Sequence, residues 1–352
     1  MEDSILTPPT ILCLYPSDIL DRMRRFDETL LAADPGFDQE TAEYFAVHTL
    51  TWGTGSTVTV AFLGGDKALH EQIAAAASKW SSHANVRFDF GVDPVSGAHR
   101  TWSRSDTNYA ADIRIKFDIG PEGGQYWSMI GTQSRNPRVC PANEASMSLR
   151  DFDTKLPQDW ETITIHEFGH AIGFKHEHQH PQGGCDDEYR WWDDPGYIPT
   201  SLSNAANVRC VYAYDATIVP DVNGKLPGLY RIAGGWPNYW SICTIDHNMR
   251  QLQNSSAYLL GPYDGESIMK YHFPAYMYRK GKQSACYSDK NDVLSDGDKA
   301  GAAILYPFAR DQSEELAIRM TTILDDALAL EAVRPDIQSF LEQQRGRFQS
   351  NQ

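Results

Sequence analysis

Hydrophobic and polar residues alternate along several short stretches in the first half of the chain. Residues 57–63 read Thr-Val-Thr-Val-Ala-Phe-Leu, and the same period of two recurs in residues 85–90 and 112–117. This period places every second side chain on one face, as in a strand that is buried on one side. Residues 67–82 carry apolar residues at helical spacing instead. The pattern therefore predicts a sheet with a helix packed on it, an α+β arrangement.

A further short strand is predicted at Ser146, Met147, Ser148 and Leu149. If this strand lies at the edge of the sheet, its unpaired main chain can bind an extended peptide by strand addition. We therefore take these four residues as a candidate substrate-binding strand. An ordinary structural strand is the alternative interpretation of the same residues.

Helical spacing also marks both ends of the chain. Apolar residues recur at intervals of three and four in residues 18–33 and again in residues 311–330, and a second amphipathic stretch follows Pro335. Packing on the central domain is one interpretation of the C-terminal helices, and contact with a partner is the other. We divide the chain into an N-terminal extension at 1–50, a main domain at 51–307 and a C-terminal helical extension at 308–352.

Composition excludes two classes of protein. The chain of 352 residues has no apolar run long enough to cross a bilayer, so no membrane span is expected. Its net charge is -16, and it has no cluster of Lys and Arg of the kind that binds phosphates, so nucleic acid is not an expected partner.

The cysteines leave the compartment open. There are six of them, widely spaced and without a Cys-x-x-Cys pair, so up to three disulfides are possible. Residues 1–9 lack the basic region and apolar run of a secretory signal.

Residues 164–177 contain the chemistry on which the functional prediction rests, Thr-Ile-His-Glu-Phe-Gly-His-Ala-Ile-Gly-Phe-Lys-His-Glu. His166 and His170 are four apart, so on a helix both imidazoles leave the same face and can hold one metal ion. Gly173 lets the helix stop and turn, and His176 can then return as a third ligand. Glu167 is placed to take a proton from a water molecule that the metal activates.

The extension of this motif favours a metal site over an ordinary helix. His-Glu-x-x-His alone also occurs on solvated helix faces, but an ordinary helix gives no reason for Gly173 and His176 at those positions. His178 and His180 are further possible ligands, although the turn at Gly173 favours His176. The sequence therefore predicts a zinc centre.

A second motif, Ser267-Ile268-Met269-Lys270-Tyr271, follows about a hundred residues later. With the long histidine motif and the Glu177 that follows it, the chain resembles the astacin branch of the metzincin zinc endopeptidases. The resemblance covers about residues 56–307 and includes weaker similarities in residues 126–131, 147–149 and 294–306.

The resemblance implies a metzincin (zincin-like) catalytic domain: a twisted mixed sheet, an active-site helix and an irregular lower subdomain. Met269 would form an apolar floor beneath the metal. Tyr271 would be a further zinc ligand at rest and would hydrogen-bond the oxyanion during the reaction. Glu177 would pair with the mature N-terminus, and an extracellular location is favoured.

Some features depart from the family pattern. The interval from His176 to Met269 is longer than usual, which implies an insertion of unknown role, and Lys270 stands where a histidine is common. The cysteines do not reproduce the family's disulfide pattern in an obvious way.

The sequence thus predicts a zinc metalloendopeptidase that hydrolyses protein or peptide substrates with Glu167 as general base. One alternative is a non-catalytic, zinc-stabilised module that binds peptides. Another is a latent zymogen silenced by residues 1–50, in which the Cys13 thiolate would occupy the open zinc position. A serralysin-like peptidase is the second enzymatic alternative. Against it stand Glu177, in place of a proline, and the lack of glycine- and aspartate-rich calcium repeats. Cleavage preference and oligomeric state are left open.

Overall fold

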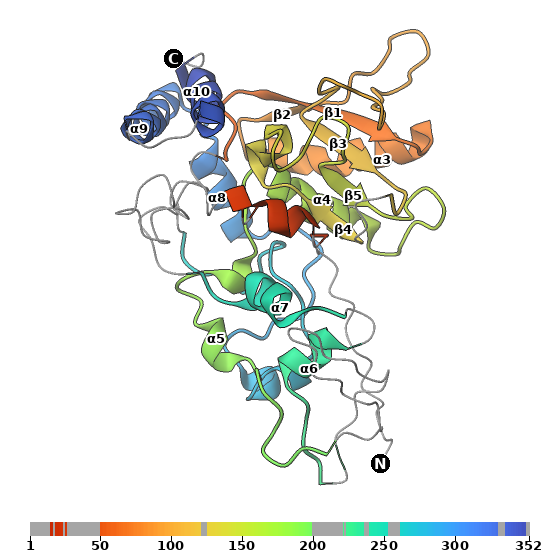
Figure 1. The fold of residues 1–352 in the computed structure, drawn as a ribbon, viewed down its shortest axis with the longest axis vertical. Helices are drawn as coiled ribbons and strands as arrows, with labels where there is room; N and C mark the ends of the chain where they lie inside the picture. Colours follow the sequence, from red (N-terminus) through yellow and green to blue (C-terminus); the bar gives the residue numbers. More distant parts are fainter. Residues whose placement is uncertain are drawn as a thin grey trace. The chain divides into compact units, whose positions relative to one another are not determined.

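The computed structural model describes residues 15–16, 18–23, 25–26, 50–120, 125–198, 221, 223–235, 239–252, 261–329 and 335–349 (Figure 1). Cys13, the candidate thiolate ligand, lies outside these residues. The chain divides into two compact units. The first contains Cys13–Lys175 and Asp292–Gln352, and the second contains His176–Gln253 and Tyr263–Asn291.

A five-stranded mixed sheet forms the centre of the first unit, in the order β2-β1-β3-β5-β4. Neighbouring strands are parallel except β4, which is antiparallel to β5. The predicted α+β fold with a mixed sheet is therefore confirmed. The strands are β1 (Thr57–Leu63), β2 (Arg87–Asp89), β3 (Ile113–Lys116), β4 (Tyr126–Ser128) and β5 (Met147–Leu149).

The position of β5 corrects one expectation. Ser146, Met147, Ser148 and Leu149 were expected at the edge of the sheet, but β5 lies between β3 and β4, and all four residues are buried. A strand that is paired on both sides cannot add a substrate strand to its main chain. The edge strand on this side of the sheet is instead β4, whose three residues are too few to show an alternating pattern.

Two helices pack against each other in the first unit, α3 (Lys67–Ser81) and α4 (Trp160–Ala171). Asp66 caps α3 by accepting a hydrogen bond from the Leu69 amide at 2.9 Å. The Trp80 indole of α3 donates to the Ile165 carbonyl of α4 at 2.8 Å. These contacts hold α4, the predicted metal-binding helix, against its neighbour.

Three helices form the C-terminal part of the first unit: α8 (Asp296–Leu305), α9 (Arg310–Leu328) and α10 (Pro335–Gln349). Ser295 and Asp298 form a capping box at the start of α8. Figure 1 shows α9 and α10 side by side, and their apolar faces share one buried cluster with Leu50 and Ile130. The C-terminal helices therefore pack against the rest of their own unit.

The second unit is irregular within its described residues. Its longer elements are α5 (Cys185–Glu188), α6 (Leu229–Gly234) and α7 (Ile242–Met249). The shorter 3-10 helices are η2 (Glu177–Gln179), η3 (Ala275–Met277) and η4 (Gly281–Gln283), while η1 (Gly131–Arg135) belongs to the first unit. A disulfide joins Cys185 to Cys286. Across the described residues, no helix combines the length and apolar character that a bilayer span requires.

Candidate metal centre

Helix α4 presents two of the predicted ligands on one face. The rings of His166 and His170 lie 4.8 Å apart between centroids and are nearly perpendicular. His176 joins them, and the candidate ligand atoms of the three side chains lie within 4.8 Å of one another. The structure therefore brings together the three histidines that the sequence motif singles out.

The donor set fits a zinc ion. Three neutral imidazoles are a common protein ligand set for zinc, with bonds of about 2.0–2.1 Å. Ligand atoms bound to one ion in this way lie about 3–4 Å apart, and the candidate atoms here lie within 4.8 Å of one another. The Nδ1 atom of His170 lies 2.8 Å from the Phe174 carbonyl oxygen. This hydrogen bond places a proton on Nδ1 and leaves Nε2 as the ligand atom.

The helix ends as the sequence predicts. Gly173 has a φ of +107°, a backbone conformation that L side chains rarely adopt. Its amide donates to the His170 carbonyl at 2.9 Å, and the Phe174 amide donates to the Gly169 carbonyl at 3.0 Å. These two bonds close the last turn of α4 directly after the second histidine.

Two side chains from distant parts of the chain complete this helix end. The Trp52 indole donates to the Ala171 carbonyl at 2.8 Å, and the Tyr306 hydroxyl donates to the Ile172 carbonyl at 2.7 Å. Sequence reasoning missed both roles. No local pattern signals them, because the partners are separated by 119 and 134 residues.

Glu167 follows the first histidine on α4 and is only 1% exposed. A carboxylate is rarely buried to this degree without a specific role or partner. Glu167 is adjacent in sequence to His166, and its predicted part in proton transfer stays a prediction.

In the second unit, the Met269 segment contacts the residues that follow the third histidine. The Glu177 amide donates to the Met269 carbonyl at 3.0 Å, and Met269 is 1% exposed. The ring of Tyr271 lies 4.3 Å from that of His176 between centroids. Met269 thus lies beside Glu177 and Tyr271 beside His176, while the roles that the resemblance assigns to them stay predictions.

The additional histidines are engaged elsewhere. His178 is fully buried, and its Nε2 lies 2.7 Å from the Asn248 carbonyl oxygen of α7. The Nδ1 atom of His180 accepts a hydrogen bond from the Gln182 amide at 3.0 Å. Among the residues with described positions, the metal cluster contains neither of them.

Glu177 and Lys270 have partners of their own. The Glu177 carboxylate accepts from the Asp264 amide at 2.7 Å, and the Lys270 ammonium donates to the Ser288 hydroxyl at 2.6 Å. Burial lowers the pKa of Lys270 to about 8, against the opposing influence of the Glu177 and Asp264 carboxylates.

The edge strand β4 directs one carbonyl away from the sheet. The Met129 amide donates to the Ser146 carbonyl at 2.8 Å. In a trans peptide group the N–H and C=O point in opposite directions, so the Ser128 carbonyl faces away from β5. There it accepts a hydrogen bond of 2.6 Å from the hydroxyl of Tyr15. The N-terminal segment therefore contacts the edge of the sheet.

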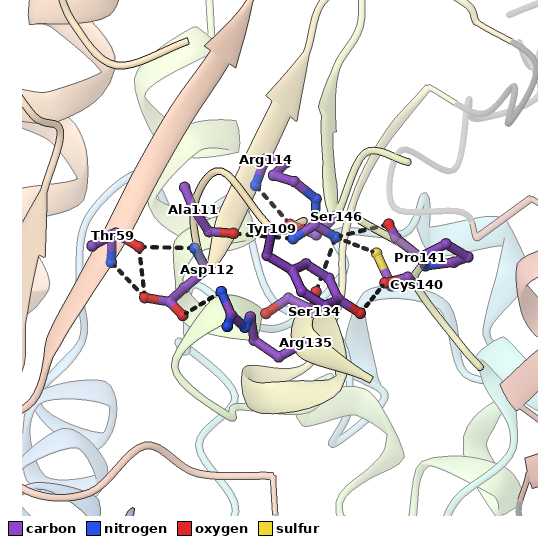
Figure 2. A network of polar contacts seen from close by, with 10 residues as sticks. All are labelled: Thr59, Tyr109, Ala111, Asp112, Arg114, Ser134, Arg135, Cys140, Pro141 and Ser146. Atoms are coloured by element: carbon purple, nitrogen blue, oxygen red, sulfur yellow. Dashed lines mark hydrogen bonds and ion pairs between the residues drawn. The ribbon is translucent and has the colours of Figure 1, made fainter. Parts of the chain in front are cut away.

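A buried polar network holds β3 to the segment of chain that precedes β5 (Figure 2). Arg114 of β3 is fully buried, and its guanidinium donates to main-chain carbonyls and to the Cys140 sulfur. Tyr109 stacks near both Arg114 and Arg135, and Arg135 pairs with Asp112 at 3.5 Å. This network fixes the loops beside the strands that precede α4.

No model of a known protein family matches the chain, and no curated protein matches its sequence. Solved structures do match it. "Structure of myroilysin" is 28% identical, covers 75% of this chain and 98% of that chain, and has a TM-score of 0.50. "Crystal structure of myroilysin" is 28% identical and covers 73% and 86%, with a TM-score of 0.41. High choriolytic enzyme 1, a hatching enzyme zinc-protease from Oryzias latipes, is 15% identical and covers 73% and 94%, with a TM-score of 0.40.

Proposed function

We propose that this chain, which resembles the astacin-like metzincins in its fold and its histidine cluster, is a zinc-dependent endopeptidase. The similarity to myroilysin and the cluster together support a zinc metalloprotease in general. The roles of individual residues, the activation route and the location of the protein are part of the proposal. The observation that carries it is the convergence of His166, His170 and His176 next to the buried Glu167.

His166, His170 and His176 would hold the zinc ion. When bound, zinc polarises a carbonyl group and lowers the pKa of water. The surrounding residues would orient the ligands, transfer the proton and stabilise the oxyanion. The hydrogen bond from His170 to the Phe174 carbonyl keeps that ring in the orientation and tautomer needed for binding.

Glu167 acts as the general base and then as the general acid. Its carboxylate takes the proton of the attacking water and returns it to the leaving amine. The burial of Glu167 supports this role, since a carboxylate shielded from bulk water exchanges its proton with the reacting groups instead of with solvent.

Three further residues have proposed roles at the metal centre. Tyr271 would bind the metal at rest and would donate a hydrogen bond to the developing oxyanion. Met269 provides an apolar, adaptable surface beneath the histidines. Glu177 has a structural role at the site.

An extended peptide substrate would pair with β4 instead of with residues 146–149. The outward carbonyl of Ser128 offers a main-chain acceptor at this edge, and strand addition gives affinity for peptides without fixing the side chains. The disulfide between Cys185 and Cys286 is consistent with an extracellular protein. We do not expect nucleic acid as a partner.

Cleavage of a mixed peptide library by the zinc-loaded protein, read by mass spectrometry, tests the activity. Glu167→Ala should abolish the cuts. Glu161→Ala is the matched control, because Glu161 lies on the same helix and is half-exposed in an ion pair with Lys79. Cuts that persist in Glu167→Ala would contradict its role as general base.

A latent form is the second candidate, and a specific contact favours it. Tyr15 is 5% exposed, donates to the outward Ser128 carbonyl, and lies near the Trp127 ring. Arg22 of the same segment pairs with Glu144 at 2.6 Å. The N-terminal segment thereby occupies an acceptor that a substrate strand would use.

Removal of residues 1–49 tests latency. If these residues silence the enzyme, the shortened protein should cleave the library faster than the full chain, and Tyr15→Phe should produce part of the gain. A shortened protein that binds zinc and remains inactive would instead indicate the peptide-binding module.

A further inference from the structure

The carbonyl groups at the end of α4 are all occupied. The last four carbonyls of a helix have no partner within the helix, and a helix end that is buried needs donors from elsewhere. Backbone amides serve the carbonyls of Phe168, Gly169 and His170, and side chains serve those of Ala171 and of Ile172, the residue that follows the helix. The pairs are Ile172 amide to Phe168, Phe174 amide to Gly169, Gly173 amide to His170, Trp52 indole to Ala171 and Tyr306 hydroxyl to Ile172.

Tyr306 and Trp52 also bind each other. The Trp52 backbone amide donates to the Tyr306 hydroxyl oxygen at 3.1 Å, while that hydroxyl donates to Ile172. Both side chains are almost completely buried. The hydroxyl of Tyr306 therefore links the segment around Trp52 to the turn that follows His170.

Residues 50–52 connect this helix end to the C-terminal helices. Leu50 belongs to the apolar cluster of α9 and α10. The methyl group of Thr51 faces Gly173, where a Cβ would lie 3.2 Å from it. Trp52 caps Ala171. Three consecutive residues thus contact the C-terminal helices, the glycine turn and the end of the metal-binding helix.

Arg347 of α10 reaches Trp52 directly. Its guanidinium carbon lies 4.8 Å from the centroid of the Trp52 ring, within the range of a cation–π contact. Arg347 therefore limits the movement of the indole that caps α4. The contact is attractive and directional, and it is made from a helix near the C-terminus of the chain.

We propose that Trp52, Tyr306 and Arg347 are positioning residues for the metal centre, and that α10 supports zinc binding through Arg347 and Trp52. The inference rests on the proposed zinc function. The two caps hold the carbonyls that immediately follow His170, and with them the turn that orients its imidazole through the Phe174 carbonyl. Loosening of this turn should raise the dissociation constant for zinc, because groups that orient ligands commonly contribute about 10–100-fold in metal affinity.

Zinc dissociation constants, measured by competition with a coloured chelator, test the proposal. Trp52→Phe and Tyr306→Phe each keep an aromatic ring and remove one side-chain donor, so each should weaken zinc binding about 10-fold. Tyr306→Phe also removes the acceptor of the Trp52 amide. Arg347→Met should weaken it several-fold, and Arg347→Lys should restore part of the loss by keeping the cation.

Two matched controls separate positioning from general stability. Trp102→Phe removes an indole that donates at 2.8 Å to the Ile115 carbonyl of β3, outside the metal-binding helix. Arg345→Met removes an ion pair of 2.6 Å between α10 and Asp325. Both controls should bind zinc within about twofold of the parent, the scatter expected for changes remote from the ligands. The rise in Tm on zinc addition should shrink only in the Trp52, Tyr306 and Arg347 variants.

The outcomes are distinct. If the three variants bind zinc as tightly as the controls and lose only stability of the metal-free protein, the positioning role is overturned. If zinc affinity falls as expected but the parent cuts no peptide, the proposed peptidase fails while the positioning role stands. A parent that binds no zinc would overturn both.

Discussion

Replacement of Arg114 by methionine should destabilise the first unit strongly. The guanidinium donates to the carbonyls of Ala111 at 3.1 Å and Ser134 at 2.9 Å (Figure 2). It also donates to the Glu144 carbonyl at 2.8 Å. It is fully buried and also stacks over Tyr109. Methionine fills a similar volume but offers no donor.

The expected loss follows from the acceptors that remain. Each buried carbonyl without a partner costs about 1–3 kcal/mol, and three such groups set a range of about 3–9 kcal/mol. The removal of a buried cation returns part of this cost, because the charge no longer has to be desolvated. We therefore expect a decrease of about 3–5 kcal/mol in the free energy of unfolding.

Urea unfolding followed by tryptophan fluorescence measures this loss. Arg310→Met is the matched control: Arg310 is 87% exposed in a surface pair with Glu314, so its removal should change stability by less than about 1 kcal/mol. Arg114→Lys should lie between the two, since an ammonium cannot reproduce the planar fork of donors. A loss for Arg114→Met no larger than that of Arg310→Met would refute the reasoning.

Two further changes test other parts of the first unit. Gly131→Ala should cost about 3 kcal/mol or more in unfolding free energy, because Gly131 has a φ of +48° and a Cβ there would lie 1.7 Å from the Leu50 carbonyl oxygen. Gly346→Ala, with open space around its Cβ, is the control in the same unfolding assay. Acid should also weaken the fold, because burial lowers the pKa values of His70 and His99. For the pKa of His70, the Gly64 carbonyl and Asp66 oppose this effect and His99 adds to it. For the pKa of His99, Glu71 opposes it and Lys67 adds to it. Their neutral forms therefore contribute stability that is complete above the unfolded pKa of about 6.5 and is lost as pH falls below it. Metal-free parent should lose more stability between about pH 7.5 and 5.5 than a His70→Gln, His99→Gln variant, and equal losses would contradict this.

Regular periodicity was sufficient for much of the fold. The strand at Thr57–Leu63 and the helix at Lys67–Ser81 were predicted nearly to the residue, because each has several positions that repeat one pattern. The strand Tyr126–Ser128 was missed, since three residues carry no measurable period. That omission led to the misplacement of residues 146–149 at the edge, because a strand's neighbours are decided by long-range pairing that its own sequence does not encode.

The candidate site shows the same division between local and distant information. The spacing of His166, His170 and Gly173 describes one helix and one turn, so chemistry and geometry can both be derived from eight residues. The donors that finish the helix end come from Trp52 and Tyr306, each more than a hundred residues away. Without knowledge of their distant partners, a tryptophan and a tyrosine in the sequence predict only core packing.

Every carbonyl from Phe168 to Ile172, at the end of α4, has a hydrogen-bond donor in the structure. The Trp52 indole is one of these donors, and its ring also contacts Arg347 of α10. The catalytic motif can be recognised without the C-terminal helices, but the rigidity that the motif needs is supplied in part by them.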